Sequence, residues 1–339
     1  MIKLLYITSS SFSGSTLLSF LLNTHPDMFT VGETEGWNYG LTEVFPCSCG
    51  APLSDCPFFR TIAAAFRSEG LPFEPREFGT RYHLVQNTRL NRYLTAELPR
   101  IGSTALETVR DQLVARVPRF AKVLERQDRA NLVFAQTALA ASQAKVFVDA
   151  SKSPYRLRHL RRIRELDFHV LYIVRDPRGV TLSNMKKKGY DASLAIRLWI
   201  NEQVTICRIM EEFPKRMIIY YEDLCDVMDD TLAAIHRSVG VAPRRPPVDF
   251  KSGEHHILGN EMRLGAVNAI VKDSRWTREL PVADLGTIAR ACAAFRQRHA
   301  NHPLSEIIAR YGCDSSRAPA PGQALSQTST EATRGSTVV

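Results

Sequence analysis

Short apolar runs alternate with longer amphipathic stretches along most of this chain. Runs of four or five mostly apolar residues occupy positions 4–7, 145–149, 170–174 and 217–220. Buried parallel strands appear in sequences as continuous apolar segments, whereas apolar residues recurring every three or four positions are typical of helices. Helical spacing follows each of these runs, so the pattern predicts an α/β fold with a mostly parallel central sheet.

The longest helical pattern covers residues 61–142, which are rich in Ala, Leu, Arg and Glu. Its place between two strands predicts a helical insertion that would form a lid or one wall of a substrate site. Further helices are predicted at 155–166, 192–212, 227–239 and 282–299. In the helix at 155–166 the leucines and Ile163 should face inward, and the arginines should form a solvated basic face. Little periodicity is present at 27–40 and 255–276, which are predicted to be loops.

One domain is predicted over residues 1–314, without internal repeats. Residues 315–339 are rich in Ser, Thr, Ala and Pro, a composition typical of a disordered tail. No segment is long and apolar enough to be a transmembrane segment, and the first residues are more typical of a strand than of a secretion signal. The cytoplasmic compartment is therefore expected, and an odd total of seven cysteines argues there against a disulfide framework.

The 339 residues carry a net charge of +9. This excess favours an anionic ligand, such as a nucleotide, a nucleic acid or an acidic membrane surface, without choosing among them. The basic residues are diffuse in the sequence and form no known nucleic-acid-binding module. We therefore expect no nucleic-acid partner.

The clearest chemical signal is the turn between the first predicted strand and the first predicted helix, residues 8–16. It consists mainly of hydroxylic residues with a single glycine, Gly14. A helix N-terminus offers unpaired N–H groups and a positive dipole end to an anion, and a glycine lets the backbone approach a phosphate closely. ATP-binding loops follow the pattern G-x-x-x-x-G-K-[ST], but Ser9 and Ser15 replace its first glycine and its lysine. The sequence therefore disfavours an ATPase and leaves an ordinary strand-to-helix turn as the alternative.

Polar residues also stand near the predicted carboxyl ends of other strands, where ligands bind in open α/β sheets. Lys152 follows the second apolar run, and Arg175 follows the third, with Ser183 eight positions later. Arginine at a strand end can bind a phosphate through two N–H groups. Glu33 and Glu35 come shortly after the first helix, where a carboxylate is either a general base or a solvated loop acid.

Three cysteines, Cys47, Cys49 and Cys56, lie within ten residues. A structural zinc site normally needs four ligands, and the sequence contains no second cluster to supply the fourth. His83 is an available histidine, but nothing in the sequence points to it. A metal site, a local or redox-sensitive disulfide and plain structural thiols all remain open.

Three segments, in this order, resemble the sulfotransferases that use 3'-phosphoadenosine-5'-phosphosulfate (PAPS). SSSFSGSTLLSFLLNTHP resembles the family's loop for the 5'-phosphosulfate, YIVRDPRGVTLSN its 3'-phosphate motif, and IIYYEDL the strand end near the adenine. A later HHILGN segment resembles a closing stretch of bacterial members. The resemblance implies a P-loop-like three-layer fold. It also implies a cofactor site made of Ser11, Phe12, Ser13, Gly14, Ser15, Thr16, Arg175, Ser183, Tyr221 and Arg263.

The resemblance further implies in-line transfer of a sulfuryl group from PAPS to a hydroxyl of a carbohydrate, glycolipid or small metabolite, with no metal required. Glu33 has the Gly-Glu context of the catalytic glutamate in carbohydrate and tyrosyl members, which makes it the expected base and Glu35 the reserve. Phe12 stands where many members carry a cation, and Lys152 is the candidate to replace that cation. Ser151 and Lys152 stand where cytosolic members carry a catalytic histidine.

Two other functions remain open, a P-loop-type nucleotide-dependent kinase and a non-catalytic relative that binds PAPS or another anion. The missing loop lysine and the pair of Arg175 and Ser183 argue against a kinase. Phe12, in place of the usual cation, favours the non-catalytic relative. The motifs identify neither the acceptor nor the oligomeric state.

Overall fold

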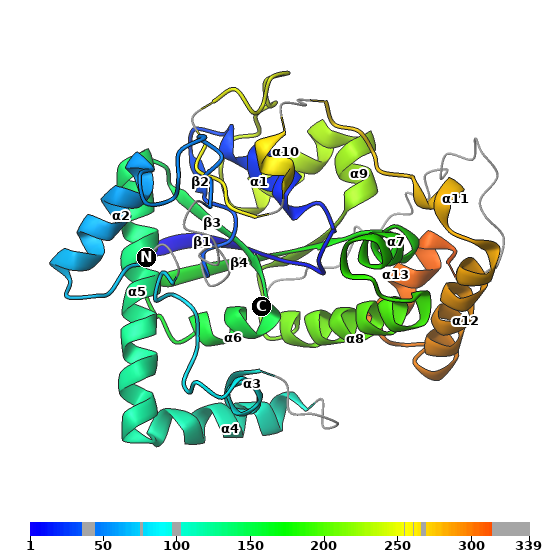
Figure 1. Cartoon of the computed structure of the whole chain (residues 1–339), viewed down its shortest axis with the longest axis horizontal. Coiled ribbons are helices and arrows are strands. Elements are labelled where there is room, and N and C mark those ends of the chain that lie inside the picture. The colour runs from blue at the N-terminus through cyan, green and yellow to red at the C-terminus, as the bar shows by residue number, and fades with distance from the viewer. Residues whose placement is uncertain are drawn as a thin grey trace, which may run out of the picture.

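The computed structural model describes residues 1–35, 45–74, 77–96, 103–253, 255–259, 261–265 and 269–313. A five-stranded sheet lies at its centre, and each pair of neighbouring strands is parallel (Figure 1). The strand order is β2-β3-β1-β4-β5. The strands are β1 (Ile2–Thr8), β2 (Met28–Thr30), β3 (Val146–Lys152), β4 (Leu166–Val174) and β5 (Arg216–Tyr220). This sheet confirms the predicted α/β fold.

Helices cover both faces of the sheet and produce three layers. Figure 1 shows α1, α9 and α10 over one face and α6 and α8 over the other. Within the described ranges, no helix has the length and apolar character needed to cross a membrane. The helices are α1 (Ser15–Asn23), α2 (Pro57–Ser68), α3 (Thr88–Thr95), α4 (Thr104–Arg116), α5 (Pro118–Ser142), α6 (Pro154–Leu160), α7 (Pro177–Lys188), α8 (Ala192–Met210), α9 (Tyr221–Asp226), α10 (Met228–Ser238), α11 (Trp276–Glu279), α12 (Val282–Arg298) and α13 (Pro303–Tyr311), with a 3-10 turn η1 (Glu261–Leu264).

Two hydrophobic cores lie on opposite faces of the sheet. Successive side chains of a strand point to opposite faces, so Leu4 and Tyr6 enter one core whereas Leu5 and Ile7 enter the other. All four are at most 2% exposed. Burial on both faces explains why the strands appeared in the sequence as continuous apolar runs rather than as an alternating pattern.

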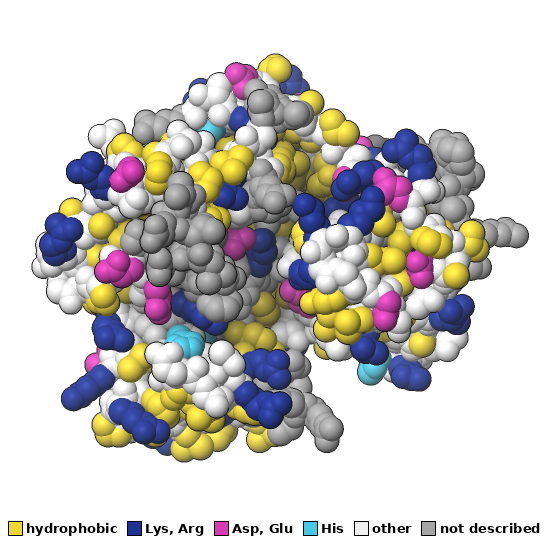
Figure 2. All heavy atoms as spheres, in the orientation of Figure 1, with side chains coloured by type: hydrophobic (Ala, Val, Ile, Leu, Met, Phe, Trp, Pro, Cys, Tyr) yellow, Lys and Arg dark blue, Asp and Glu magenta, His cyan; other side chains and the backbone are white. Residues whose placement is uncertain are grey.

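The helices α2 to α5 lie between β2 and β3 in the chain, in the region where the sequence predicts a helical insertion at about 61–142. The insertion is anchored by α5, whose 25 residues pack against α2, β2 and β3. Figure 1 shows α3 and α4 extending from the lower end of α5, away from the sheet. Residues 314–339 lie outside the described residues, so the tail remains a prediction. Lys and Arg side chains are dispersed over the visible face among acidic and hydrophobic ones (Figure 2).

Two expectations about local structure are wrong. The stretch predicted to be a loop at 27–40 contains β2, which pairs with β3 at the edge of the sheet. The helix predicted at 155–166 ends at Leu160, because the chain continues in turns that bond Arg162 N–H to His159 O and Ile163 N–H to Leu160 O. Its apolar residues are nevertheless buried as expected, with Leu157, Leu160 and Ile163 at most 5% exposed.

The arginines of α6 do not form a solvated face. Arg156 is 3% exposed and Arg158 is 9% exposed. Arg156 forms an ion pair with Asp149 on β3, and Arg158 pairs with Glu107 on α4. Burial of a charge requires such partners, so α6 joins the sheet to the insertion through ion pairs.

Candidate functional site

The turn between β1 and α1 has the backbone of an anion-binding loop. Phe12 has φ 65° and Gly14 has φ 90°, and α1 begins directly afterwards at Ser15. Inside the turn the hydroxyls of Ser10 and Ser13 are hydrogen-bonded at 2.7 Å. The buried Ser9 Oγ has no hydrogen-bond partner among the described residues. The first turn of α1 and this hydroxyl form an environment suited to a bound oxyanion.

Tyr221 packs directly on this loop. A Cβ added at Gly14 would lie 2.5 Å from Cδ2 of the Tyr221 ring, so a side chain larger than glycine does not fit there. Tyr221 is the first residue of α9, immediately after β5. The strand end at Tyr221 and the loop at Gly14, which the sequence analysis assigned to one site, are therefore in contact.

Arg175 joins these two segments. Its Nη1 donates to the carbonyl oxygen of Phe12 at 2.9 Å, across 163 positions of sequence. Its guanidinium carbon lies 4.7 Å from the centre of the Tyr221 ring, a cation–π arrangement. The three predicted motifs therefore converge at the carboxyl ends of β1, β4 and β5.

Ser183 lies on the same side of α7 as the Arg175 guanidinium. A Cβ at Gly179 would be 3.1 Å from the Nε and Nη2 of Arg175, and the hydroxyl of Ser183 donates to the carbonyl oxygen of Gly179 at 2.9 Å. The absence of a side chain at Gly179 gives the guanidinium room against the first turn of the helix. The arginine and the serine thus both contact Gly179.

Asp273 is a site residue that the sequence analysis missed. Its Oδ2 and its carbonyl oxygen each lie 3.0 Å from Nη2 of Arg175, and its N–H donates to the Tyr221 hydroxyl at 3.0 Å. A hydrogen bond from Arg275, and then one from Arg175, hold the pKa of the Asp273 carboxyl well below its ordinary value. An anion that binds Arg175 must therefore compete with this carboxylate. The stretch 255–276 has little periodicity, so nothing in the sequence indicated its fold.

The two predicted catalytic residues contact each other. The ammonium group of Lys152 donates to Oε1 of Glu33. Lys152 stands at the irregular end of β3, with φ 70°, and its carbonyl oxygen accepts a hydrogen bond from Thr8 at 2.7 Å. A Cβ at Gly259 would lie 3.2 Å from Thr16 Oγ1 and 3.7 Å from Glu33 Oε1. Glu33 and Lys152 therefore lie beside the start of α1, but the replacement of the missing loop cation by Lys152 stays a prediction.

Arg263 is held by the backbone of two neighbouring segments. Its Nη1 donates to the carbonyl oxygen of Gly259 at 2.7 Å, and its Nε lies 3.3 Å from the carbonyl oxygen of Pro46. Its guanidinium also covers the ring of Phe45 at 4.2 Å. These contacts fix the turn at Gly259, and a direct role of Arg263 in binding a cofactor stays a prediction.

A polar cleft of about 270 Å³ lies between the insertion and the loop after β3. Glu35 faces it, and burial raises the pKa of the Glu35 carboxyl above its ordinary value. Ser153, the residue after Lys152, also lines this cleft, whereas Glu33 and Lys152 are not among the lining residues. The insertion contributes one wall of this cleft, and its role at a substrate site stays a prediction. The lining residues are Glu35, Arg81, Tyr82, His83, Thr88, Asn91, Arg92, Thr95, Ala96, Ser153, Tyr155, Arg156 and His159.

His159 at the floor of this cleft is expected to make the protein less stable in acid. Its Nε2 donates to the carbonyl oxygen of Thr95, and its Nδ1 accepts from Arg162. Burial, followed by the charge of Arg162, lowers the pKa of His159 to about 3, whereas an unfolded histidine titrates near 6.5. The unfolded state therefore binds more protons between these values, and stability is lost as the pH falls below about 6.5.

The measurement is urea unfolding of the wild type and His159→Gln at pH 7, 6 and 5. Below pH 6.5 the wild type should lose up to about 1.4 kcal/mol per pH unit more than the variant. Equal pH slopes for the two proteins would show that His159 is not held neutral.

Comparison with known proteins gives similarity to solved structures only. No family model matches this chain, and no curated protein matches it. The sulfotransferase domain from the Synechococcus olefin synthase is 18% identical, with 82% of this chain and 83% of that chain covered and a TM-score of 0.42. The sulfotransferase domain from the curacin biosynthetic pathway is 15% identical (93% and 97% covered, TM-score 0.44). A sulfotransferase from Mycobacterium avium is 14% identical (87% and 77% covered, TM-score 0.39). At such TM-scores, a functional assignment depends on the residues of the site.

Proposed function

We propose that this chain is a PAPS-dependent sulfotransferase that transfers a sulfuryl group to a hydroxyl of a carbohydrate, a glycolipid or a small metabolite. The observation that carries the proposal is the contact of Arg175 with both the Phe12 carbonyl and the Tyr221 ring. Three segments that resemble the family's separate PAPS motifs form one site through this arginine. An accidental resemblance at one motif gives no reason for the other two to be adjacent to it.

The residues present fit a donor with two separate phosphate groups. The Ser9 hydroxyl, which has no partner among the described residues, and the start of α1 at Ser15 suit an oxyanion. Arg175 and Ser183 both contact Gly179 at the start of α7, where a second phosphate would find a cation and a hydroxyl. When bound, PAPS supplies the activated sulfuryl group.

The residues of the chain then bind the donor, orient the reacting groups and remove a proton from the acceptor. Serine hydroxyls and N–H groups of the loop stabilise negative charge at the start of α1. Lys152 orients the Glu33 carboxylate beside Thr16, and an Oε atom of Glu33 accepts the proton of the acceptor hydroxyl. The polar cleft holds the acceptor, because it is lined by hydrogen-bonding side chains that include Glu35 and Ser153, which are close in sequence to Glu33 and Lys152.

The test is binding of 3',5'-ADP, the product left after sulfuryl transfer, compared with ATP–Mg²⁺ by calorimetry and thermal shift. We expect 3',5'-ADP to bind and to raise the melting temperature, and ATP–Mg²⁺ to have no effect. Stabilisation by ATP–Mg²⁺ alone would instead support the kinase, because its loop must hold a triphosphate. Binding of 3',5'-ADP without turnover of PAPS on any hydroxyl acceptor would indicate the non-catalytic relative.

Arg175→Ala should weaken 3',5'-ADP binding by roughly tenfold to 150-fold, because a hydrogen bond to a charged group contributes about 1.5–3 kcal/mol. In the free protein Arg175 is already paired with Asp273, and a bound anion must replace this contact. The expected loss of affinity therefore stays within this range. Arg197→Ala removes the same charge from an exposed position of α8 and should leave the affinity unchanged. Equal affinity in the Arg175 variant and the wild type would remove Arg175 from the cofactor site.

A further inference from the structure

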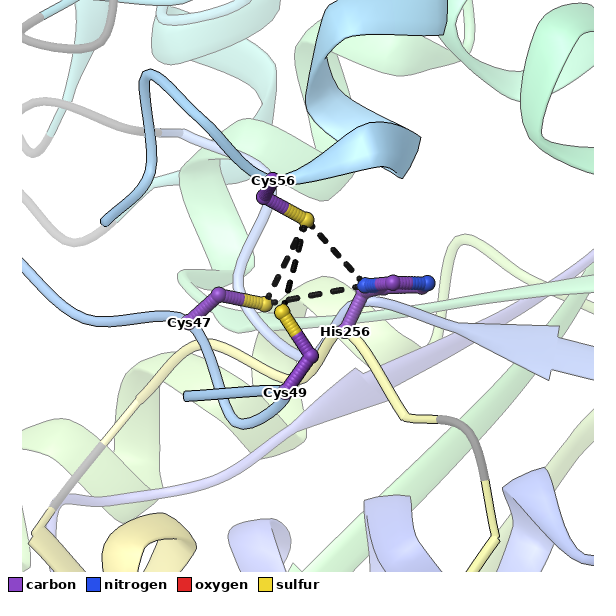
Figure 3. A group of neighbouring side chains, drawn as sticks. All are labelled: Cys47, Cys49, Cys56 and His256. Atoms are coloured by element: carbon purple, nitrogen blue, oxygen red, sulfur yellow. Dashed lines mark hydrogen bonds between the residues drawn. The ribbon is translucent and has the colours of Figure 1, made fainter. Parts of the chain in front are cut away.

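Three cysteines and one histidine from distant parts of the chain meet beside the site. Figure 3 shows Cys47, Cys49 and Cys56 pointing toward one another and toward the Nδ1 of His256. The four ligand atoms all lie within 4.8 Å of one another. Cys56 and His256 are 200 positions apart in sequence, which explains why the sequence offered no fourth ligand. His83 lines the polar cleft instead.

Four of the six distances between these atoms are close to the edges of a metal tetrahedron. The Sγ of Cys56 lies 3.7 Å from the Sγ of Cys47 and 3.7 Å from the Sγ of Cys49. The Nδ1 of His256 lies 3.2 Å from Cys56 Sγ and 3.8 Å from Cys47 Sγ. With Zn–S bonds of about 2.3 Å and Zn–N bonds of about 2.0–2.1 Å, a tetrahedral site has S···S edges of about 3.8 Å and S···N edges of about 3.5 Å.

The backbone around the cysteines holds this arrangement. The N–H of Gly50 donates to the Cys47 carbonyl at 3.0 Å, and the φ of 88° at Gly50 closes the turn that carries Cys47 and Cys49. The Ser48 hydroxyl donates to the His255 carbonyl at 2.8 Å and accepts from the Ile257 N–H at 2.7 Å. These bonds fix the histidine segment against the cysteine turn on both sides of His256.

We propose that Cys47, Cys49, Cys56 and His256 bind one structural zinc ion. Three thiolates and one imidazole form a Cys₃His set, which selects zinc through its soft sulfur ligands and tetrahedral geometry. All four positions are filled by protein, so the ion has no open position for a substrate. A disulfide would join only two of the three sulfurs at about 2.05 Å and would leave the third cysteine and the histidine without a common function.

The zinc ion would connect the segment before α2 to the segment that covers the phosphate loop. Leu258, two residues after His256, donates its N–H to the Val31 carbonyl at 2.7 Å. The next residue, Gly259, is the one that lies against Thr16 and Glu33. Ligation of His256 therefore fixes the backbone beside Glu33, and the ion positions the site without touching the reacting atoms.

The test begins with the metal content of the full-length protein purified without chelator. Elemental analysis should give one zinc per chain, and replacement by Co²⁺ should give the near-ultraviolet thiolate-to-cobalt absorption of a Cys₃His site. A zinc content near zero after growth in zinc-supplemented medium would overturn the proposal. A Cys47–Cys56 or Cys49–Cys56 disulfide in the non-reduced protein, detected by mass spectrometry, would also overturn it.

Variants separate ligation from general loss of fold. Cys49→Ser changes the exposed member of the set and should lower zinc affinity by at least about a hundredfold in competition with a chelator. The matched control is Cys313→Ala. Cys313 and Cys292 are buried cysteines with Sγ atoms 3.5 Å apart, and they do not belong to the four-ligand set. The Cys313 variant should keep one zinc per chain. An unchanged zinc affinity in Cys49→Ser would refute the four-ligand site. Because these readouts do not involve PAPS, they are independent of the proposed transfer activity.

Discussion

Replacing Glu33 by glutamine is expected to reduce the rate of sulfuryl transfer by about 10²–10⁴-fold, the usual contribution of a positioned general base. Glutamine retains the shape of the side chain and can still accept a hydrogen bond from Lys152, but its amide oxygen is too weakly basic to take the acceptor proton. The effect should therefore fall on turnover. Affinity for 3',5'-ADP should stay within about twofold of the wild type, because no binding group of the loop is changed.

Glu35→Gln is the matched control for this experiment. Both substitutions remove one carboxylate from the same short segment, but only Glu33 contacts Lys152 and lies beside Gly259 and Thr16. We expect Glu35→Gln to change turnover by less than about tenfold, through its place in the acceptor cleft. The assay measures release of 3',5'-ADP from PAPS with a panel of hydroxyl acceptors.

The opposite result would assign the base to Glu35. Full turnover in the Glu33 variant, with loss in the Glu35 variant, would move the proton acceptor to the cleft. The pH dependence would then change as well, because burial raises the pKa of the Glu35 carboxyl. Transfer that depends on Glu35 would lose rate at a higher pH on the acid side than transfer through a carboxyl of ordinary pKa. If both variants kept full turnover, neither carboxylate would be the base.

The sheet and the phosphate loop could be predicted because their signals are local. Leu4–Ile7 is a continuous apolar run typical of a strand buried on both faces, and the loop at Gly14 is followed at once by helical spacing. The spacing of Arg175 and Ser183 is also local, since both belong to the turn and first helix after β4. The parallel arrangement alone then brings the carboxyl ends of the strands to one edge of the sheet, so their convergence can be predicted without knowledge of tertiary contacts.

Features that depend on distant partners could not be predicted. The three residues of β2 form a strand because β3 lies beside them, and the glycines that follow them were typical of a loop. His256 joins three cysteines two hundred positions earlier, and Asp273 reaches Arg175 from a stretch without periodicity. The arginines of α6 lie on a helix whose spacing predicts solvent contact, but Asp149 of β3 and Glu107 of the insertion pair with them as buried acidic partners. A sequence pattern shows which face is apolar, but it does not show that a charged face is also covered.

The buried pair of Arg156 and Asp149 should therefore be sensitive to mutation. Their side chains are each 2% exposed, and their ion pair spans 3.1 Å. Arg156 also donates to the Thr80 carbonyl at 2.7 Å, to Thr34 Oγ1 at 2.7 Å and to Asn131 Oδ1 at 2.6 Å. One guanidinium thus connects β3, α5 and the segment that carries Glu33.

Arg156→Met is expected to lower the free energy of unfolding by about 3–5 kcal/mol, the usual cost of breaking a buried pair from one side. Methionine fills much of the volume, so the loss arises mainly from the uncompensated Asp149 carboxylate and three lost hydrogen bonds. The control is Arg129→Met on α5, whose pair with Glu69 is 48% and 40% exposed and should contribute at most about 1 kcal/mol. Urea unfolding at pH 7 measures both.

A second substitution separates charge from packing. Asp149→Asn in the Arg156→Met background removes the uncompensated charge and keeps a side chain that can hydrogen-bond to Ser151 and Thr34. The double variant should therefore be more stable than Arg156→Met alone, which makes the coupling between the two sites favourable. If the double variant were as unstable as the sum of the single changes, the hydrogen bonds to Thr80, Thr34 and Asn131 would be the main contribution of Arg156. An Arg156→Met variant as stable as the Arg129 control would show that this network does not hold the insertion to the sheet.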